Sequence, residues 1–520
     1  MTRAVKSYAW VFLLLMIGML ALPAQAQKTS PVDDYFRRGL DPFWRTNEMH
    51  ESVFFFQPAV VSDKSQGSPE KNWPQAKLLF LPNQVLRVTS MSHEITYEPG
   101  RDYLVDERTG TLYLPPSSRI PFKTFDQLYP LLTAGDATVP FITKTGDPTR
   151  GILFGEGSFY PSLQAEVTYT LTPGQWTGYI PQYAGEILPK TTAKLQAQQQ
   201  IKMFILGDSI SQGYNASKWV VTPPFQPPYG ELVAGGLETA FHAPRPSVGS
   251  YRNFAIAGWI ATQGLQQVNN LRIGLDQPDL VLIAFGANDA FRHDPAGYKA
   301  DIQAIMDAIR ADSPNTEFIL VSSLVANREW AIMPVDQFPL MRDALAQLTG
   351  PGVALADITS VWQTMLQRKT FYDITGNGVN HPNDFSHMLY AQTILSLLMP
   401  GPVAYVGKPA QTANKQTFQL DGSRSLPGPN GPVTYLWQMT PTSHPATIAG
   451  ADTATPTITF GAGPGTYFLT LTVTDAHGVQ NAAPLTLTFF KTKDQDRDHD
   501  EASTSDAAEP VSETTESAPF

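Results

Sequence analysis

Hydrophobic and polar positions alternate in a regular way between residues 201 and 400 of the 520-residue chain. Short apolar runs are each followed by a longer amphipathic stretch, a pattern typical of buried strands alternating with helices. The predicted strands are MFIL (203–206), NFAIA (253–257), LVLIAF (280–285), EFILVSS (317–323) and VALAD (353–357). The predicted helices lie at 262–275, 297–312 and 338–350. This alternation predicts an α/β domain with a doubly wound parallel sheet and helices on both faces.

Two β-rich regions flank this domain. Residues 32–192 carry short β-type runs separated by Pro, Gly and Asn clusters, and two of these runs, 102–105 and 111–114, predict a hairpin around ERTG. We therefore expect an N-terminal all-β domain, either a sandwich or a jelly-roll-like layer. Residues 401–490 hold β-type runs about ten residues apart with Gly/Pro turns, which predicts a C-terminal β-sandwich.

The ends of the chain differ from the domains between them. Residues 1–26 combine two basic residues, an apolar run and a small-residue ending, as in a cleavable signal peptide. No later stretch is long and apolar enough to predict a membrane span, so none is expected after cleavage. Residues 491–520 are rich in Asp, Glu, Ser and Thr, which predicts a disordered acidic tail.

Charge and cysteine content narrow the location and the partners. The formal net charge is −11, and removing the two basic residues of the leader gives −11 − 2 = −13. Such a balance argues against a nucleic-acid partner. The chain has no cysteine and folds without disulfides. For an exported protein this favours a secreted or periplasmic bacterial one.

A candidate nucleophile follows the first strand of the α/β domain. The apolar run ends at Gly-Asp-Ser, and Ser209 then begins a helix-compatible segment. Open parallel sheets place reactive groups at this edge, where strands end and helices begin. Gly-Asp-Ser is also an ordinary turn or helix cap, so the motif needs partners elsewhere in the chain.

Three partner motifs follow in order. Gly258 closes the second strand, Asn288 lies in Gly-Ala-Asn-Asp after the third, and His381 lies in Asn-His-Pro-Asn before a long apolar helix. From residue 201 to 398 the chain therefore resembles the SGNH (GDSL-type) hydrolase family. The phrases YEPGRDYLVD and SRIPF resemble the N-terminal β region of some two-domain esterases of this family. LDGSRS, YLWQM and LTVTDAHG resemble a PKD-type, immunoglobulin-like module.

The resemblance implies a flavodoxin-like catalytic domain and assigns a role to each motif. Ser209 would be the nucleophile and His381 the base. The backbone N–H groups of Ser209 and Gly258 and the amide of Asn288 would form the oxyanion hole. A second histidine, His387, lies further into the helix and is the alternative base.

The acid that orients the base is open from sequence. The family carries an aspartate three residues before the histidine, where this chain has Gly378. We assign Asp384 to the site, since it also forms a D-x-x-H string with His387. Asp373 and Asn377 are the other candidates, and a Ser–His dyad without an acid is the remaining alternative.

These features predict an exported serine esterase that works through an acyl-enzyme. The flanking β domains favour a carbohydrate ester, such as an O-acetyl group on a polysaccharide, as the substrate. The alternatives are a lipid or thioester acyl hydrolase, or an inactive carbohydrate-binding surface protein. No motif indicates a metal or an organic cofactor.

Overall fold

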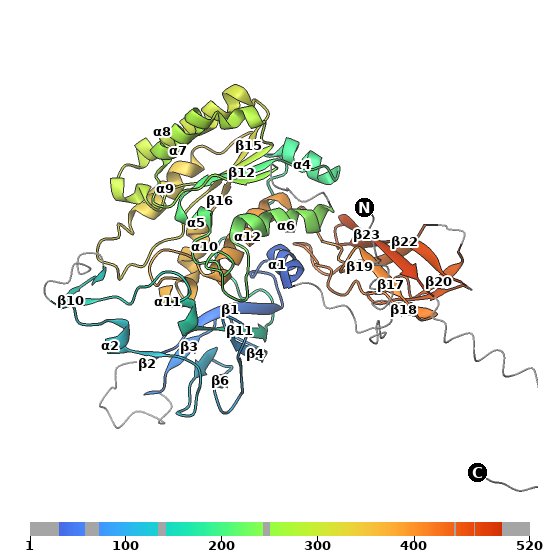
Figure 1. The fold of residues 1–520 in the computed structure, drawn as a ribbon, viewed down its shortest axis with the longest axis horizontal. Helices are drawn as coiled ribbons and strands as arrows, with labels where there is room; N and C mark the ends of the chain where they lie inside the picture. The colour runs from blue at the N-terminus through green and yellow to red at the C-terminus, as the bar shows by residue number, and fades with distance from the viewer. Residues whose placement is uncertain are drawn as a thin grey trace, which may run out of the picture.

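The computed structural model describes residues 31–57, 72–133, 142–242, 250–440, 444–461 and 463–490. The predicted signal peptide and acidic tail lie outside these residues. The N-terminal β-rich region packs beneath the α/β domain, and the C-terminal sandwich lies to one side (Figure 1). Among the described helices, none combines the length and apolarity that crossing a membrane requires.

The central sheet is parallel throughout, as predicted. Its strands lie in the order β13-β12-β14-β15-β16. Their bounds are β12 (Met203–Gly207), β13 (Tyr251–Asn253), β14 (Leu280–Ala284), β15 (Glu317–Val321) and β16 (Val353–Ala356). The strand order reverses between β12 and β14, and open α/β sheets bind ligands in the crevice beyond the strand ends at such a point.

Alternate side chains of β12 enter two separate cores. Phe204 and Leu206 belong to one core, under α7 (Ala261–Leu271), α8 (Pro295–Asp312) and α9 (Gln337–Ala346). Met203 and Ile205 belong to the other, with α6 (Tyr229–Phe241) and α12 (Asp384–Leu398). The sheet is thus covered on both faces, as the doubly wound prediction requires. The shorter helices of this domain are α5 (Ser209–Gln212), α10 (Ile358–Met365) and α11 (Phe371–Ile374).

The N-terminal region is built on two main sheets. One is antiparallel, in the order β1-β11-β4-β5, and the other has the order β6-β7-β3-β2-β8. The first contains β1 (Glu48–Phe54), β11 (Gln164–Thr170), β4 (Gln84–Ser90) and β5 (Thr96–Tyr97). The second contains β6 (Leu104–Asp106), β7 (Thr111–Tyr113), β3 (Gln75–Lys77), β2 (Phe56–Gln57) and β8 (Lys123–Thr124). Strands β6 and β7 pair antiparallel, which confirms the predicted hairpin.

Helices in the described residues depart from an all-β reading of this region, among them α1 (Pro31–Leu40), α2 (Phe125–Leu128) and α4 (Pro189–Gln196). Helix α1 packs on α6 and α12 of the α/β domain. The ring of Phe36 fills the space where a side chain on Gly235 would be, 2.3 Å from an added Cβ. A ten-residue helix is marginal alone, so this one depends on tertiary packing that local sequence does not reveal.

The C-terminal region is a β-sandwich of two sheets, as predicted. Their orders are β17-β23-β22-β19 and β18-β21-β20, and Trp437 is buried between them. The strands are β17 (Ala410–Ala413), β18 (Thr417–Gln419), β19 (Thr434–Met439), β20 (Ala446–Ala449), β21 (Thr457–Phe460), β22 (Gly465–Thr474) and β23 (Gln480–Phe489). The sandwich contacts the α/β domain through Asn481, which donates to the carbonyl of Ala240 at 3.0 Å.

Candidate active site

Ser209 is the first residue of α5, directly after the tight turn that ends β12. Asp208 caps the helix by accepting the N–H of Ile210 at 3.0 Å. Gly207 allows β12 to end there, because an added Cβ would lie 2.4 Å from the hydroxyl of Ser211. Burial raises the pKa of Asp208 to about 7, and the carboxylate of Asp289 adds to that shift. The turn therefore presents the serine on a rigid support.

The nucleophile and base candidates meet across 172 residues of sequence. Oγ of Ser209 lies 2.9 Å from Nε2 of His381. Each residue is 8% exposed, so the pair is largely buried but keeps a small area in contact with solvent. The histidine lies in the loop before α12, which Asn383 caps by accepting the N–H of Ser386. The contact between Oγ of Ser209 and Nε2 of His381 is the hydrogen bond that proton transfer from a serine hydroxyl needs.

The oxyanion-hole candidates come from two neighbouring turns. Gly258 has φ +78° and faces open space, which suits the close approach of a substrate. Asn288 donates through Nδ2 to the carbonyl of Trp259 at 3.0 Å, which places the amide beside the Gly258 turn. Gln212 of α5 accepts the N–H of Ala257 at 2.8 Å and ties the same turn to the serine helix. An amide nitrogen carries two hydrogens, so the bond to Trp259 leaves one for a ligand.

The carboxylate facing the other nitrogen of His381 belongs to Glu156. Its oxygens lie 3.0 and 3.1 Å from Nδ1. Burial raises the pKa of this carboxyl, but hydrogen bonds from His381 and Asn377 outweigh that effect and hold the pKa below its ordinary value. Glu156 is therefore ionised at neutral pH and able to accept the Nδ1 hydrogen.

Asn377 connects this carboxylate to the histidine loop. Its Nδ2 donates to Glu156 at 2.9 Å. Its Oδ1 accepts the backbone N–H groups of Val379, Asn380 and His381 at 3.0–3.1 Å. Asn377, a possible partner of the base from sequence, instead binds both the histidine loop and the carboxylate of Glu156.

The prediction that Asp384 is the acid is corrected by this geometry. Its carboxylate accepts the backbone N–H of Ser217 at 2.8 Å, and burial raises its pKa to about 6. Asp373 is also engaged elsewhere, accepting the N–H groups of Phe54 and Thr370 at 2.7 Å. Both aspartates hold loops in place, because each satisfies buried backbone donors.

His387, the alternative base, is fully buried away from the serine. Its Nε2 lies 3.0 Å from the carbonyl of Tyr214, and its Nδ1 lies 3.4 Å from the N–H of Tyr229. Burial lowers the pKa of this imidazole to about 4. The ring is therefore neutral at physiological pH and supports the loop that follows the serine helix.

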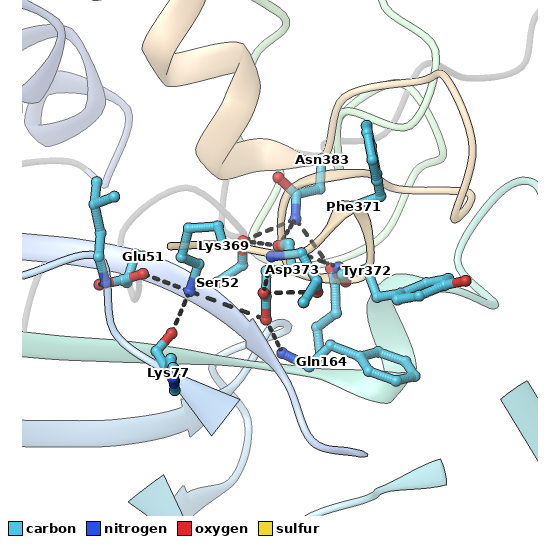
Figure 2. A network of polar contacts seen from close by, with 12 residues as sticks. Glu51, Ser52, Lys77, Gln164, Lys369, Phe371, Tyr372, Asp373 and Asn383 are labelled. Atoms are coloured by element: carbon cyan, nitrogen blue, oxygen red, sulfur yellow. Dashed lines mark hydrogen bonds and ion pairs between the residues drawn. The ribbon is translucent and has the colours of Figure 1, made fainter. Parts of the chain in front are cut away.

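A buried polar network fastens the histidine loop to the N-terminal region (Figure 2). Asn383 donates to the hydroxyl of Ser52 on β1 at 2.9 Å and to Gln164 on β11 at 3.1 Å. Asp373 adds its bond to the backbone of Phe54 at the end of β1. The loop is thus held by residues from both parts of the chain.

Sequence reasoning missed Glu156, which lies 225 positions before its histidine. The available signals were indirect. Gly378 stands where an acid was expected, and Glu156 lies between two glycines in an otherwise β-rich stretch. Neither signal identifies the contact between Glu156 and His381, because the sequence of a loop between strands does not indicate which other domain the loop packs against.

Comparisons with known proteins agree with the architecture. A model of the GDSL-like Lipase/Acylhydrolase family matches residues 205–389, and a PKD domain model matches residues 400–489. The two resemblances inferred from sequence are thereby confirmed. A search of curated proteins gave no match.

Solved structures match one domain at a time. A lipase from a goat rumen metagenome is 15% identical, with a TM-score of 0.31, over 38% of this chain and 96% of the lipase. An acetylxylan esterase from Geobacillus stearothermophilus is 17% identical, with a TM-score of 0.31, over 38% of this chain and 94% of the esterase. The PKD domain of the KIAA 1837 protein is 26% identical, with a TM-score of 0.16, over 17% of this chain and 87% of that domain.

Proposed function

Residues 205–389 form a GDSL-like lipase/acylhydrolase domain, and from this premise we propose that the chain hydrolyses carboxylic esters through an acyl-enzyme on Ser209. The observation that carries the proposal is the 2.9 Å contact between Oγ of Ser209 and Nε2 of His381. This contact argues against an inactive binding protein, because the nucleophile and the base are already aligned.

The reaction follows from the positions of these groups. Oγ of Ser209 attacks the ester carbonyl carbon while its proton passes to Nε2 of His381. The negative charge that forms on the carbonyl oxygen is stabilised by the N–H groups of Ser209 and Gly258 and the amide of Asn288. The tetrahedral intermediate then expels the alcohol, which takes the proton from Nε2. Water repeats the sequence on the acyl-enzyme and releases the acid.

We favour a carbohydrate ester as substrate because a row of aromatic rings leads from the base to the surface. The ring of Tyr214 lies 5.0 Å from that of His381, and the ring of Trp219 stacks on Tyr214 at 5.7 Å. Trp219 is 43% exposed and offers a flat face to a ligand. The C–H groups of a sugar ring pack well on such a face, which is electron-rich. An O-acetyl group on an oligosaccharide or polysaccharide is the substrate class that fits.

The proposed function includes export of the protein from the cytoplasm. It rests on the signal-like residues 1–26. A secreted or periplasmic enzyme would meet polysaccharide esters outside the cell.

The function is tested with p-nitrophenyl esters of graded chain length. Ser209→Ala and His381→Ala should each lower kcat by about 10³-fold or more, since removing a member of a catalytic serine–histidine pair typically does so. His293→Ala, at an exposed histidine, is the matched control and should leave kcat unchanged. Turnover by Ser209→Ala would exclude the nucleophile. If His387→Ala is inactive and His381→Ala is active, the assignment of His381 as the base is wrong.

The substrate class is tested with an acetylated oligosaccharide. Trp219→Ala should raise KM about tenfold for this substrate and leave KM for p-nitrophenyl acetate nearly unchanged, in line with the loss of one stacked aromatic contact. Phe468→Ala, at a 53% exposed ring of the C-terminal sandwich, is the control. A preference for long acyl chains, with no effect of Trp219→Ala, would favour the lipid alternative.

A further inference from the structure

The histidine loop has no room for an acid of its own at the position where one was expected. Gly378 has φ +84°, a conformation that side-chain-bearing residues rarely adopt. An added Cβ would lie 2.6 Å from the carbonyl oxygen of Leu153 and 2.8 Å from the ring of Tyr160. Both obstacles belong to the N-terminal region, so the segment 153–160 occupies this space.

The same segment delivers a carboxylate to the histidine. The N–H of Gly155 donates to the carbonyl of Asn377 at 3.3 Å, which brings Glu156 against Nδ1 of His381. At the far end of the segment, Tyr160 is fully buried. Its ring stacks on Phe54 of β1 with centroids 5.7 Å apart. The carboxylate therefore rests on a segment that is fixed on both sides.

We propose that Glu156 is the positioning acid of the active site, so that the N-terminal β-rich region completes the catalytic machinery. This inference rests on the proposed esterase function. Glu156 accepts the Nδ1 hydrogen of His381 and fixes the tautomer whose Nε2 can take the serine proton. While Nε2 holds that proton, the carboxylate stabilises the imidazolium, and it remains ionised throughout.

The interface around the loop suits such a shared site. Asn383 donates hydrogen bonds to Ser52 on β1 and Gln164 on β11, so the loop is fixed in position relative to the N-terminal sheet (Figure 2). Two further titratable side chains lie near His381: Tyr214, whose ring is 5.0 Å away, and His387, which burial keeps neutral. Glu156 is then the charged partner of the base, and its removal should affect proton transfer more than folding.

The experiment compares Glu156→Gln, Glu156→Ala and Glu156→Asp in the full chain, with p-nitrophenyl acetate as substrate. Glu156→Gln should lower kcat by about 10²–10⁴-fold with little change in KM, as expected when the carboxylate behind a catalytic histidine is neutralised. The acidic limb of its kcat/KM profile should move to lower pH, because a neutral amide no longer favours the protonated imidazole. Glu156→Asp should recover part of kcat. Glu107→Gln, an exposed carboxylate in the same region, is the control.

The outcomes separate this inference from the proposed function. If Glu156→Gln keeps kcat within about threefold of wild type, or loses activity with an unmoved acidic limb, Glu156 is not the positioning acid. That result leaves the esterase function intact as long as Ser209→Ala is inactive, whereas an active Ser209→Ala overturns the function itself. The side chain of Glu156 is 41% exposed, so Tm should stay near the wild-type value. If the Tm of Glu156→Gln falls, the pH profile of kcat/KM for Glu156→Asp is the deciding measurement. A full loss of kcat in Glu156→Asp with an unmoved acidic limb again overturns the proposal.

Discussion

Nζ of Lys369 lies 2.6 Å from a carboxylate oxygen of Glu51, and neither side chain is exposed to solvent. The lysine follows α10 in the α/β domain, and the glutamate lies on β1 of the N-terminal region (Figure 2). Nζ also donates to the carbonyl of Lys77 at 2.9 Å. A buried ion pair with further hydrogen bonds fixes the orientation of the parts that it joins, because a slip would leave a charge unpaired.

Breaking this pair should therefore destabilise the protein strongly. Lys369→Met leaves the carboxylate of Glu51 buried without its cation, which typically costs about 3–5 kcal/mol of unfolding free energy. Urea unfolding at neutral pH measures the loss. The control is Arg272→Ala, which removes a surface pair with Asp312 and should leave the unfolding free energy nearly unchanged. Similar losses in the two variants would contradict the assigned role of the buried pair.

The proposed oxyanion hole supplies the second prediction. Asn288→Ala removes an amide donor from the turn beside Gly258 and should lower kcat by about 10²–10³-fold, with KM little changed. Steady-state kinetics with p-nitrophenyl acetate measures the effect. Asn315→Ala, at an exposed asparagine that contacts Lys190, should leave kcat unchanged. A large rise in KM at constant kcat would instead place Asn288 in ground-state binding.

Much of the architecture could be predicted because it depends on local patterns. Four of the five apolar runs coincide with parallel strands, whereas β13 shares only Asn253 with the predicted run 253–257. Parallel strands bring their carboxyl ends to one edge. The sequence alone therefore assigns Ser209 and Asn288 to a common site. Helix α1 could not be predicted, because its stability comes from packing on α6 and α12. The carboxylate of Glu156 could not be assigned either, since nothing local to its segment indicates which domain it contacts.

The buried His387 predicts a pH dependence of stability. Its folded-state pKa of about 4 lies below the ordinary value of 6.5, so the unfolded chain binds more protons between these two values. The stability from the neutral buried ring is complete above about pH 6.5 and is lost as pH falls through about 4, a change of up to about 3 kcal/mol.

The measurement for His387 is a difference between two proteins. The unfolding free energy of wild type minus that of His387→Gln should decrease as pH falls from 7.5 to about 4. Taking the difference cancels the contributions of the buried carboxyls of Asp208, Asp289 and Asp384, whose pKa values burial raises and whose effects run in the opposite direction. A difference that does not change with pH would contradict the neutral buried state.

Asn377→Asp isolates one hydrogen bond of the histidine loop. The new carboxylate keeps the oxygen that accepts three backbone N–H groups but turns a second oxygen toward Glu156. Two carboxylates in contact share one proton at low pH and carry a single negative charge, as in the wild type; when that proton is lost, a second negative charge near His381 favours the protonated imidazole. We expect kcat/KM to fall about tenfold near pH 6, where more of the base is protonated, and to recover toward pH 9. A decrease of the same size at every pH would indicate a distorted loop.

The contact between Gly378 and the segment 153–160 gives the last prediction, for which the chain holds a matched control. Gly100 has φ +83°, almost the same as Gly378, but has open space around its Cβ position. Gly100→Ala should cost only the backbone strain of about 1–2 kcal/mol. Gly378→Ala adds a collision with Leu153 and Tyr160 and should cost about 1–3 kcal/mol more. Because relief of the collision would push the segment outward, Gly378→Ala should also reduce kcat by weakening the contact between Glu156 and His381. Urea unfolding and kinetics of both variants test this, and equal losses of stability with unchanged kcat would show that the segment yields freely and does not fix the acid.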